Sequence, residues 1–385
     1  MSESYRFSLT SCYLLIIFCI IGMNPLYSKN NKYFDFYIKA SSEYNDNIFS
    51  LSGSQESTYY ENNPEDNTSG RFEDMNSLSD NIFSPEFGMG YKINNPFGGR
   101  LELSSQVIFN YFVENENKSY PEFGLNIKQT VSEYTEIRLE TSYIYGFFNK
   151  NYLSDITDLA GPNVGRDERI YSAGIYDEFE VTADYRYSFD LKGKDMFFTE
   201  LRLKPYLGFN FRKYNSDFEN RDRDVLFSGL SIDLEMLKVI ELSAGYEYEL
   251  ISSPGNEELI LFDEIEYGSD VNGDFSIRAN APLFTEIDRS ADRHKFEIGT
   301  KIGLFKDLEL DMGYGYTQTI YSSDNELDLS HYEQTENSWQ TEASLKYKFS
   351  KFLNCEIGYQ YENEFDADDG NIITRSLTGK LRYDF

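Results

Sequence analysis

Apolar and polar residues alternate along most of this chain, and one nine-residue pattern recurs six times. Its odd positions are apolar or small, with the seventh and ninth usually aromatic, and its even positions are mostly polar, charged or Gly. The copies are Leu101–Phe109, Ile137–Tyr145, Leu201–Phe209, Ile240–Tyr248, Leu308–Tyr316 and Leu353–Tyr361. A period of two predicts β-strands with one apolar and one polar face. Aromatic residues at one end of the apolar face are typical of a membrane interface.

Most copies follow another alternating segment across a short polar link, such as Lys238–Val239 or Lys306–Asp307, whereas long polar stretches separate the hairpins. Short turns at one end and long loops at the other are typical of outer-membrane barrels, with the short turns periplasmic. The additional strands expected are Phe34–Tyr44, Phe83–Ile93, Pro121–Val131, Ser172–Phe189, Leu226–Met236, His294–Leu304, Glu333–Phe349 and Leu377–Phe385. The chain therefore predicts an all-β, antiparallel up-and-down transmembrane barrel of about fourteen strands, with both termini periplasmic.

The stretch Ser252–Arg293 leaves the strand count open. Glu258–Tyr267 and Phe275–Thr285 are candidates for one more hairpin, which gives about sixteen strands. Seven acids and no base lie between Glu257 and Asp274, which disfavours a membrane-embedded pair. We expect a long surface loop here, with any hairpin standing above the lipid. A soluble β-sandwich or propeller also alternates, but it does not explain the fixed aromatic position or the asymmetric links.

Residues 1–28 have the features of a secretory signal peptide. Arg6 precedes the apolar run Tyr13–Met23, which is short for a transmembrane helix, and the small Ser28 is a candidate cleavage position. The alternative is an uncleaved anchor. After Ser28 no apolar run approaches the length of a spanning helix, so crossing a membrane requires closed strands. We expect residues 29–385 to form a single outer-membrane barrel domain.

The charge is strongly acidic, with a formal net value of −31, and aromatic residues make up 17% of a chain whose mean hydropathy is −0.54. Nucleic acid is excluded as a partner, because phosphate contacts need basic patches. Many acids fall in the proposed outer loops Asp46–Asp80 and Asp324–Glu336. They form either a solvated, repulsive surface or a region that attracts cations to the outer mouth.

The lining of the barrel is where we expect function. If the odd positions of the pattern face lipid, the even ones face inward. The lumen-lining candidates are Glu102, Arg138, Glu140, Arg202, Lys204, Glu241, Glu247, Glu309, Asp311, Lys346, Glu356 and Arg382. On the descending strands, inward bases concentrate near the periplasmic end and acids lie higher. This predicts a hydrated bore that passes small polar solutes with a weak cation preference. The alternative is a closed barrel in which these charges pair and hold the wall rigid.

Candidates for catalysis or metal binding are few. His294 and His331 are the only histidines and belong to no recognisable catalytic motif, so we expect no enzyme, no catalytic residue and no cofactor. Asp366–Asn371 resembles the start of a calcium loop but lacks the spaced Glu, so we interpret it as an acidic turn and expect no metal site. Cys355 is the one cysteine after residue 28, and we expect it to be a small outward or packing residue.

The segment Ser42–Phe49 resembles the opening of the family known as beta-barrel porin 2, in which a first strand runs into a similar Asp-Asn-Ile-Phe step. That step returns at Asp80–Phe83, and the Gly-Tyr-x-Tyr segments at Gly245–Tyr248, Gly313–Tyr316 and Gly358–Tyr361 are also similar to that family. Its members are outer-membrane barrels, some encoded beside exopolysaccharide-export genes. The resemblance implies a porin or a polysaccharide-export conduit and brings no catalytic residues.

The expected partners follow from this interpretation. They are outer-membrane lipid and lipopolysaccharide, the barrel-assembly machinery through the C-terminal strand, and either small solutes or polysaccharide. A function of a different class stays open, in which a closed barrel uses its acidic outer loops for adhesion or surface binding.

Overall fold

The computed structural model describes residues 34–61, 72, 75–94, 99–153, 171–191, 197–253, 256–260, 283–323, 331–366 and 370–385. The expected signal peptide (1–28) lies outside these residues, as does most of the acidic stretch 324–336. None of the helices in the described ranges is long and apolar enough to cross a membrane.

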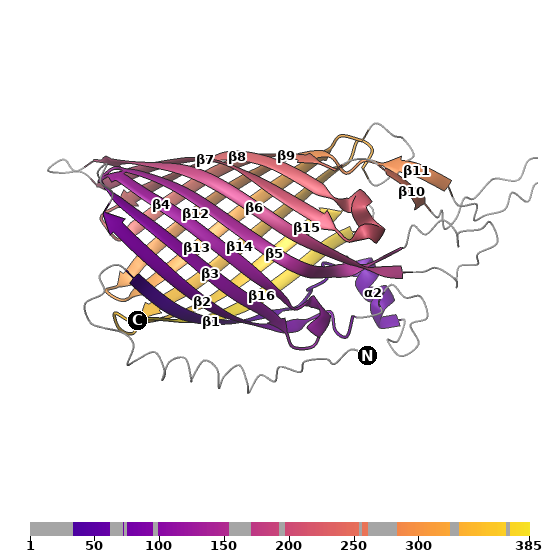
Figure 1. Cartoon of the computed structure of the whole chain (residues 1–385), viewed down its shortest axis with the longest axis horizontal. Coiled ribbons are helices and arrows are strands. Elements are labelled where there is room, and N and C mark those ends of the chain that lie inside the picture. The colour runs from indigo at the N-terminus through magenta and orange to yellow at the C-terminus, as the bar shows by residue number, and fades with distance from the viewer. Residues whose placement is uncertain are drawn as a thin grey trace, which may run out of the picture.

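Fourteen antiparallel strands form one closed barrel, in which the strands follow their order along the chain, with β9 next to β12, and β16 returns to pair with β1 (Figure 1). The strands are β1 (Phe34–Asn45), β2 (Asp80–Asn94), β3 (Arg100–Phe112), β4 (Tyr120–Ser132), β5 (Thr135–Leu153), β6 (Tyr171–Asp190), β7 (Phe198–Tyr214), β8 (Arg223–Met236), β9 (Ile240–Ser252), β12 (Ala291–Phe305), β13 (Leu308–Tyr321), β14 (Thr335–Lys348), β15 (Leu353–Asp366) and β16 (Gly370–Asp384). This confirms the expected up-and-down barrel of fourteen strands.

The sixteen-strand alternative is wrong. β10 (Asn256–Ile260) and β11 (Leu283–Ile287) pair only with each other, in a separate two-stranded sheet. β9 pairs directly with β12 across twelve register positions, which leaves no place for a further hairpin in the wall. The remainder of the two segments expected to form that hairpin, residues 261–282, lies outside the described chain.

The two ends of the barrel differ, as the links in the sequence predict. At one end, which we call the turn end, strands are joined by links such as Glu133–Tyr134 and Lys306–Asp307. The carboxyl terminus also lies there, where the Phe385 N–H donates to the Phe36 carbonyl at 3.0 Å. The opposite, loop end carries α2 (Gly53–Glu61), the 3₁₀ turns Glu116–Lys118 and Ser216–Arg221, and the β10–β11 hairpin (Figure 1).

Large apolar side chains cover the outside of the wall. Ile298, Leu207 and Ile357 are 62%, 61% and 59% exposed in the middle of their strands. The register keeps such residues on one face, so that Ile298 lies between Ala244 and Tyr314 on the adjacent strands. An apolar band this extensive is stable against lipid rather than water, which agrees with a transmembrane barrel.

Charged and polar side chains occupy the opposite, concave face. Contacts there reach across a whole strand: Tyr37 on β1 donates to Gln106 on β3 at 3.0 Å, and Arg202 on β7 lies 3.0 Å from Glu241 on β9. Strands two places apart are separated by roughly 10 Å, and wall curvature draws together only the side chains that point inward. The polar face is therefore the inner wall.

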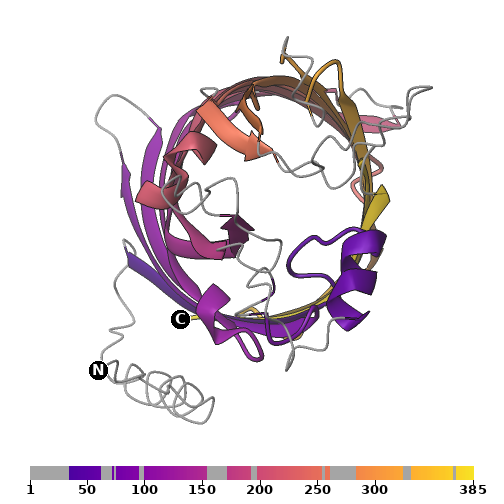
Figure 2. The same cartoon turned by 90° about the vertical axis from the view of Figure 1, so that its right-hand side faces the viewer.

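A buried apolar group lies at the loop end, where the β1–β2 connection folds back on the barrel. We call it the mouth cluster, and it consists of Phe49, Leu51, Tyr59, Phe72, Met75, Leu78 and Phe148. Six of these residues belong to the β1–β2 connection and Phe148 to β5. Figure 2, which looks onto the loop end, shows the indigo β1–β2 segment beside β16 and inside the outline of the ring.

Candidate functional site: the inner wall of the barrel

Arg202 is the centre of one group of ion pairs on the inner wall. Its guanidinium lies 3.0 Å from carboxylate oxygens of both Glu200 and Glu241, and 3.9 Å from those of Asp233 and Glu235. Lys301 approaches the same Glu241 at 3.4 Å. Because β7, β8, β9 and β12 all contribute, this group ties four adjacent strands together near the turn end.

The other sequence-predicted residues occupy the same face, and most have an oppositely charged neighbour. Glu309 lies opposite Lys346 in the register of β13 and β14. The ion pairs are Arg138–Glu140 at 3.1 Å, Lys346–Asp311 at 2.9 Å, Lys380–Glu356 at 3.0 Å, Glu102–Arg100 at 3.1 Å, Glu247–Lys295 at 2.9 Å, Lys204–Asp184 at 3.8 Å and Arg382–Asp384 at 2.8 Å. The structure brings them together as local pairs along the wall.

Water reaches these charges. The side chains of Arg202, Lys204 and Lys380 keep 24%, 29% and 39% of their surface exposed while they form ion pairs. Partial hydration of this kind keeps the net contribution of each pair to stability small, typically about 1 kcal/mol or less. The wall is thus a wet, charged surface rather than a packed core.

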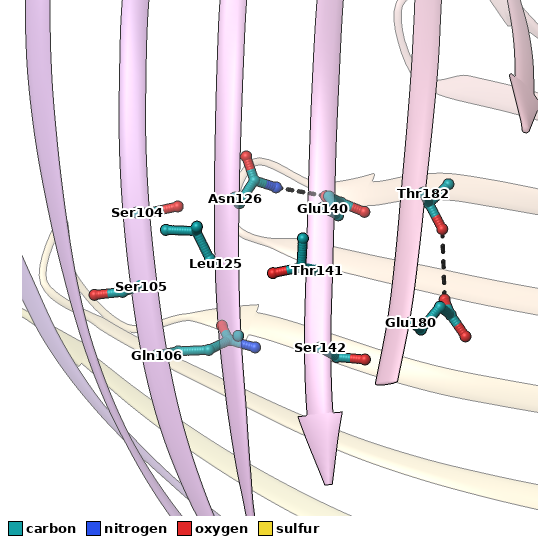
Figure 3. A pocket seen from close by; sticks show the side chains of 11 residues that line it. Ser104, Ser105, Gln106, Leu125, Asn126, Glu140, Thr141, Ser142, Glu180 and Thr182 are labelled. Atoms are coloured by element: carbon teal, nitrogen blue, oxygen red, sulfur yellow. Dashed lines mark hydrogen bonds between the residues drawn. The ribbon is translucent and has the colours of Figure 1, made fainter. Parts of the chain in front are cut away.

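The wall is hollowed where small inward residues lie beside longer ones. One recess of about 270 Å³ lies across β3, β4, β5 and β6 (Figure 3). Asn126 donates to Glu140, and Thr182 donates to Glu180, along its edges. A second recess of about 350 Å³ lies across β12 to β15 and includes Glu297, Glu362 and Lys295. Both present hydroxyl, amide and carboxylate groups, which suit hydrated ions and polyhydroxylated solutes.

Lys118 is a residue that sequence reasoning missed. It lies in the 3₁₀ turn between β3 and β4 and is only 2% exposed. Its Nζ donates to the carbonyl oxygens of Phe148 at 3.2 Å and Asn149 at 2.9 Å, and lies 4.5 Å from the centre of the Phe49 ring. Burial, and after it the like charge of Lys150, lowers the pKa of the Lys118 ammonium to about 7.

Asp184 on β6 is a second inward residue absent from the sequence-based candidates. Its side chain is only 1% exposed, and the cationic atoms nearest to it, on Arg138 and Lys204, stand at 3.9 and 3.8 Å. Among the residues the structure describes, neither carboxylate oxygen has a hydrogen-bond donor. The alternation places Asp184 on the inner face, but it does not reveal that neighbouring side chains cover it.

The remaining candidates for chemistry do not assemble into a site. The described residues hold no group of three or more His, Cys, Asp or Glu side chains arranged for a metal ion. His294 contacts the hydroxyl of Tyr246 at 2.9 Å, and His331 packs against the Tyr321 ring. Cys355 is half-buried in the register row of Tyr347 and Leu381.

Comparisons with known proteins identify no relative. No family model matches the chain, and no curated protein matches it either. Among solved structures, the outer membrane channel DcaP of Acinetobacter baumannii is 10% identical, with 91% of this chain and 96% of that one covered and a TM-score of 0.42. An anion-selective porin from Comamonas acidovorans is 9% identical, with 91% and 98% covered and a TM-score of 0.39. Likenesses this distant say nothing about what passes through the barrel.

Proposed function

We propose that this chain is a passive channel of the outer membrane of a Gram-negative-type bacterium, with both termini on the periplasmic side. It admits small polar solutes and has a weak preference for cations. The apolar outer face contacts membrane lipid, and the described termini of the barrel lie at the turn end, which in outer-membrane barrels faces the periplasm.

The observation that carries this proposal is a closed ring of fourteen strands with a hydrated, charged inner wall. Strands about 4.8 Å apart and tilted by about 40° close into a ring with a backbone diameter of roughly 28 Å. Side chains on both walls narrow that width, and the partial exposure of the inward charges supports an interior that they do not fill. A ring of this kind suits diffusion of polar solutes.

The cation preference follows from carboxylates that lack a partner. In the described part of the chain, Glu297, Glu342 and Glu362 form no ion pair, whereas Arg202, Lys346 and Lys380 are each held by acids. A wall with surplus negative charge in a low-dielectric surrounding raises the local concentration of cations. The preference is expected to be weak, because water and salt screen charges on a wide wall.

Reconstitution into planar lipid bilayers tests the proposal. Stepwise current increases are expected, with a reversal potential in a KCl gradient that favours K⁺ over Cl⁻ and a preference that shrinks as salt rises. Heat-denatured protein at the same concentration is the control. Correctly folded protein, recognised by its heat-modifiable mobility in gels, that inserts without conducting would contradict the proposal.

A second version of this proposal is that the same barrel exports polysaccharide chains rather than admitting small solutes. Liposome swelling with sugars of graded size distinguishes a small-solute channel, whose rates fall steeply with sugar size, from a conduit for long chains. A closed barrel with adhesive loops predicts neither current nor swelling.

A further inference from the structure

We infer that the mouth cluster is the element that sets the size limit for solutes entering the barrel, and that Lys118 holds it in place. The inference rests on the proposed channel function and assigns solute selection to specific residues at the loop end. It concerns the β1–β2 connection, which the sequence presents only as an acidic loop.

Described residues of the β1–β2 connection contact β16 on one side and β5, five strand intervals along the wall, on the other. On one side, Ser52 forms a β-bridge with Ile372 of β16, and Asn47 donates to the Ile373 carbonyl at 3.2 Å. On the other side, the Phe49 ring meets the Phe148 ring of β5 edge to face, with 6.4 Å between ring centres. In a ring about 28 Å wide, positions five strands apart are roughly 25 Å apart in a straight line, which passes about 6 Å from the barrel axis.

β5 bends to meet this connection. Its register with β6 shifts between Ile144 and Phe147 and again between Phe148 and Asn151. Gly146 has φ of +65° at the first shift, and its N–H donates to Asp177 at 2.8 Å. Bulges of this kind re-aim side chains and bend a strand. Figure 2 shows the loop-end segments of β5 and β6 turning inside the outline of the ring. Phe148 of β5 is 3% exposed.

Lys118 lies between the β1–β2 connection and β5 and contacts both. Its amine donates to backbone carbonyls of β5 at Phe148 and Asn149, while Phe49 of the β1–β2 connection and Phe147 of β5 place their rings at 4.5 and 4.8 Å. A cation or amine between aromatic faces, with two carbonyl acceptors, is a specific and directional contact. Removing the amine takes its donor from the buried carbonyl of Phe148, which favours separation of the β1–β2 connection from β5.

Liposome swelling with a monosaccharide and a tetrasaccharide tests this inference. Lys118→Ala is expected to raise the ratio of tetrasaccharide to monosaccharide rates by roughly threefold or more, because selection by size depends steeply on pore diameter. Lys351→Ala is the matched control. Lys351 also lies 4.5 Å from an aromatic ring, that of Phe352, but at the turn end, and its loss is expected to leave the ratio unchanged.

A reversible crosslink distinguishes loss of the contact with β5 from release of the whole β1–β2 connection. Ser52→Cys and Ile372→Cys, added to Lys118→Ala with Cys355→Ser, introduce thiols at a β-bridge whose Cα atoms are about 5 Å apart, within disulfide range. The crosslink fixes the connection to β16, on the side away from Lys118. The same raised ratio in the oxidised and the reduced protein is therefore expected, which assigns the effect of Lys118→Ala to the lost contact with β5 rather than to release of the whole connection.

The possible outcomes distinguish this inference from the channel proposal. If wild-type protein causes no swelling with either sugar, the channel function itself fails. If wild-type protein passes the monosaccharide but Lys118→Ala and the reduced crosslink variant show the same ratio as wild type, the inference about the mouth cluster is overturned.

Discussion

The Tyr37 ring lies directly over Gly88 on the neighbouring strand, so close that a Cβ on Gly88 would stand 2.2 Å from two ring carbons. From that position the hydroxyl shares its one proton between Glu86 Oε1 at 2.7 Å and Gln106 Oε1 at 3.0 Å. Gly229 is covered by the Tyr206 ring in the same way, with 2.3 Å to the nearest ring carbon. Inward glycines thus let these two aromatic rings lie flat on the wall.

Gly88→Ala is expected to destabilise the barrel by roughly 1–3 kcal/mol, the usual cost of overpacking, because the Tyr37 ring must leave and both its hydrogen bonds break. Gly90→Ala is the control on the same strand and face, where the nearest atom to an added Cβ, that of Asp35, is 3.8 Å away. Urea unfolding in lipid vesicles measures the difference. Equal effects of the two substitutions would show that the ring position is unimportant.

A charge on the outer face tests the orientation of the wall. Ile298→Arg places a cation mid-strand on the exposed apolar face, with an expected cost of about 2–4 kcal/mol in lipid. Phe305→Arg changes a residue that is 76% exposed at the turn end, where the expected cost is about 0–1 kcal/mol. Unfolding of both variants in vesicles of the same lipid gives the comparison. A larger cost for Phe305→Arg would contradict the proposed placement in the bilayer.

Removal of Arg202 is expected to increase the cation preference. Arg202→Gln leaves Glu200, Asp233, Glu235 and Glu241 with one base fewer among them, so the inner wall becomes more negative. The reversal potential in a KCl gradient is expected to shift further toward that of K⁺. Lys306→Gln serves as the control. It also removes one positive charge, but in the exposed β12–β13 turn and not on the inner wall. A shift of equal size in both variants would assign the effect to net charge alone.

The closed arrangement of the mouth cluster, with Lys118 buried, is expected to become more stable as pH rises above 7. Lys118 has an ordinary pKa of 10.5 when solvated and a pKa of about 7 when buried, so the buried arrangement favours the neutral amine. The penalty for burying its charge is complete below pH 7 and absent above about 10.5. Between these values the closed arrangement gains up to roughly 1.4 kcal/mol for each pH unit.

Sugar selectivity at pH 7 and pH 9.5 measures this effect. Wild-type protein is expected to exclude large sugars more strongly at pH 9.5, whereas Lys118→Met, which keeps the apolar stem, is expected to show no such change. Burial raises the pKa of nearby Tyr59 above its ordinary value of 10, so its titration lies beyond this range. Identical pH profiles for the two proteins would rule out Lys118 as the titrating group.

Much of the wall could be predicted from sequence, because alternation with a period of two places every residue of a strand on one of two faces. The strand expected at Ile137–Tyr145, for example, lies within β5. The expected strand ends at Tyr145, the ninth position of the recurring pattern. Beyond it the alternation breaks, because Gly146 is followed by two large aromatic residues, Phe147 and Phe148. That break was the available signal for a bulge.

The mouth cluster could not be predicted in the same way. Phe49, Leu51 and Met75 are scattered among acids with no helical or strand period, and their partner Phe148 is distant in sequence. Lys118 has the sequence context of an ordinary solvated loop lysine, between Asn117 and Ser119. Alternation assigns a face to a side chain, but it does not specify its contacts, which depend on loop conformations that bring distant segments together.

The pairing of β16 with β1 has a consequence for how the barrel forms. Tyr37 pairs with Asp384 and Asn45 with Ser376, so the seam joins segments from the two ends of the described chain. Every other pair in the wall is nearer in sequence, and loop-closure entropy makes such local hairpins faster to form. The seam is therefore the last ladder to assemble, and until it does the sheet has two unpaired edges that are prone to pair with another chain. An assembly intermediate would be most vulnerable to aggregation at these two strands, and a factor that shields them would protect the barrel until the seam closes.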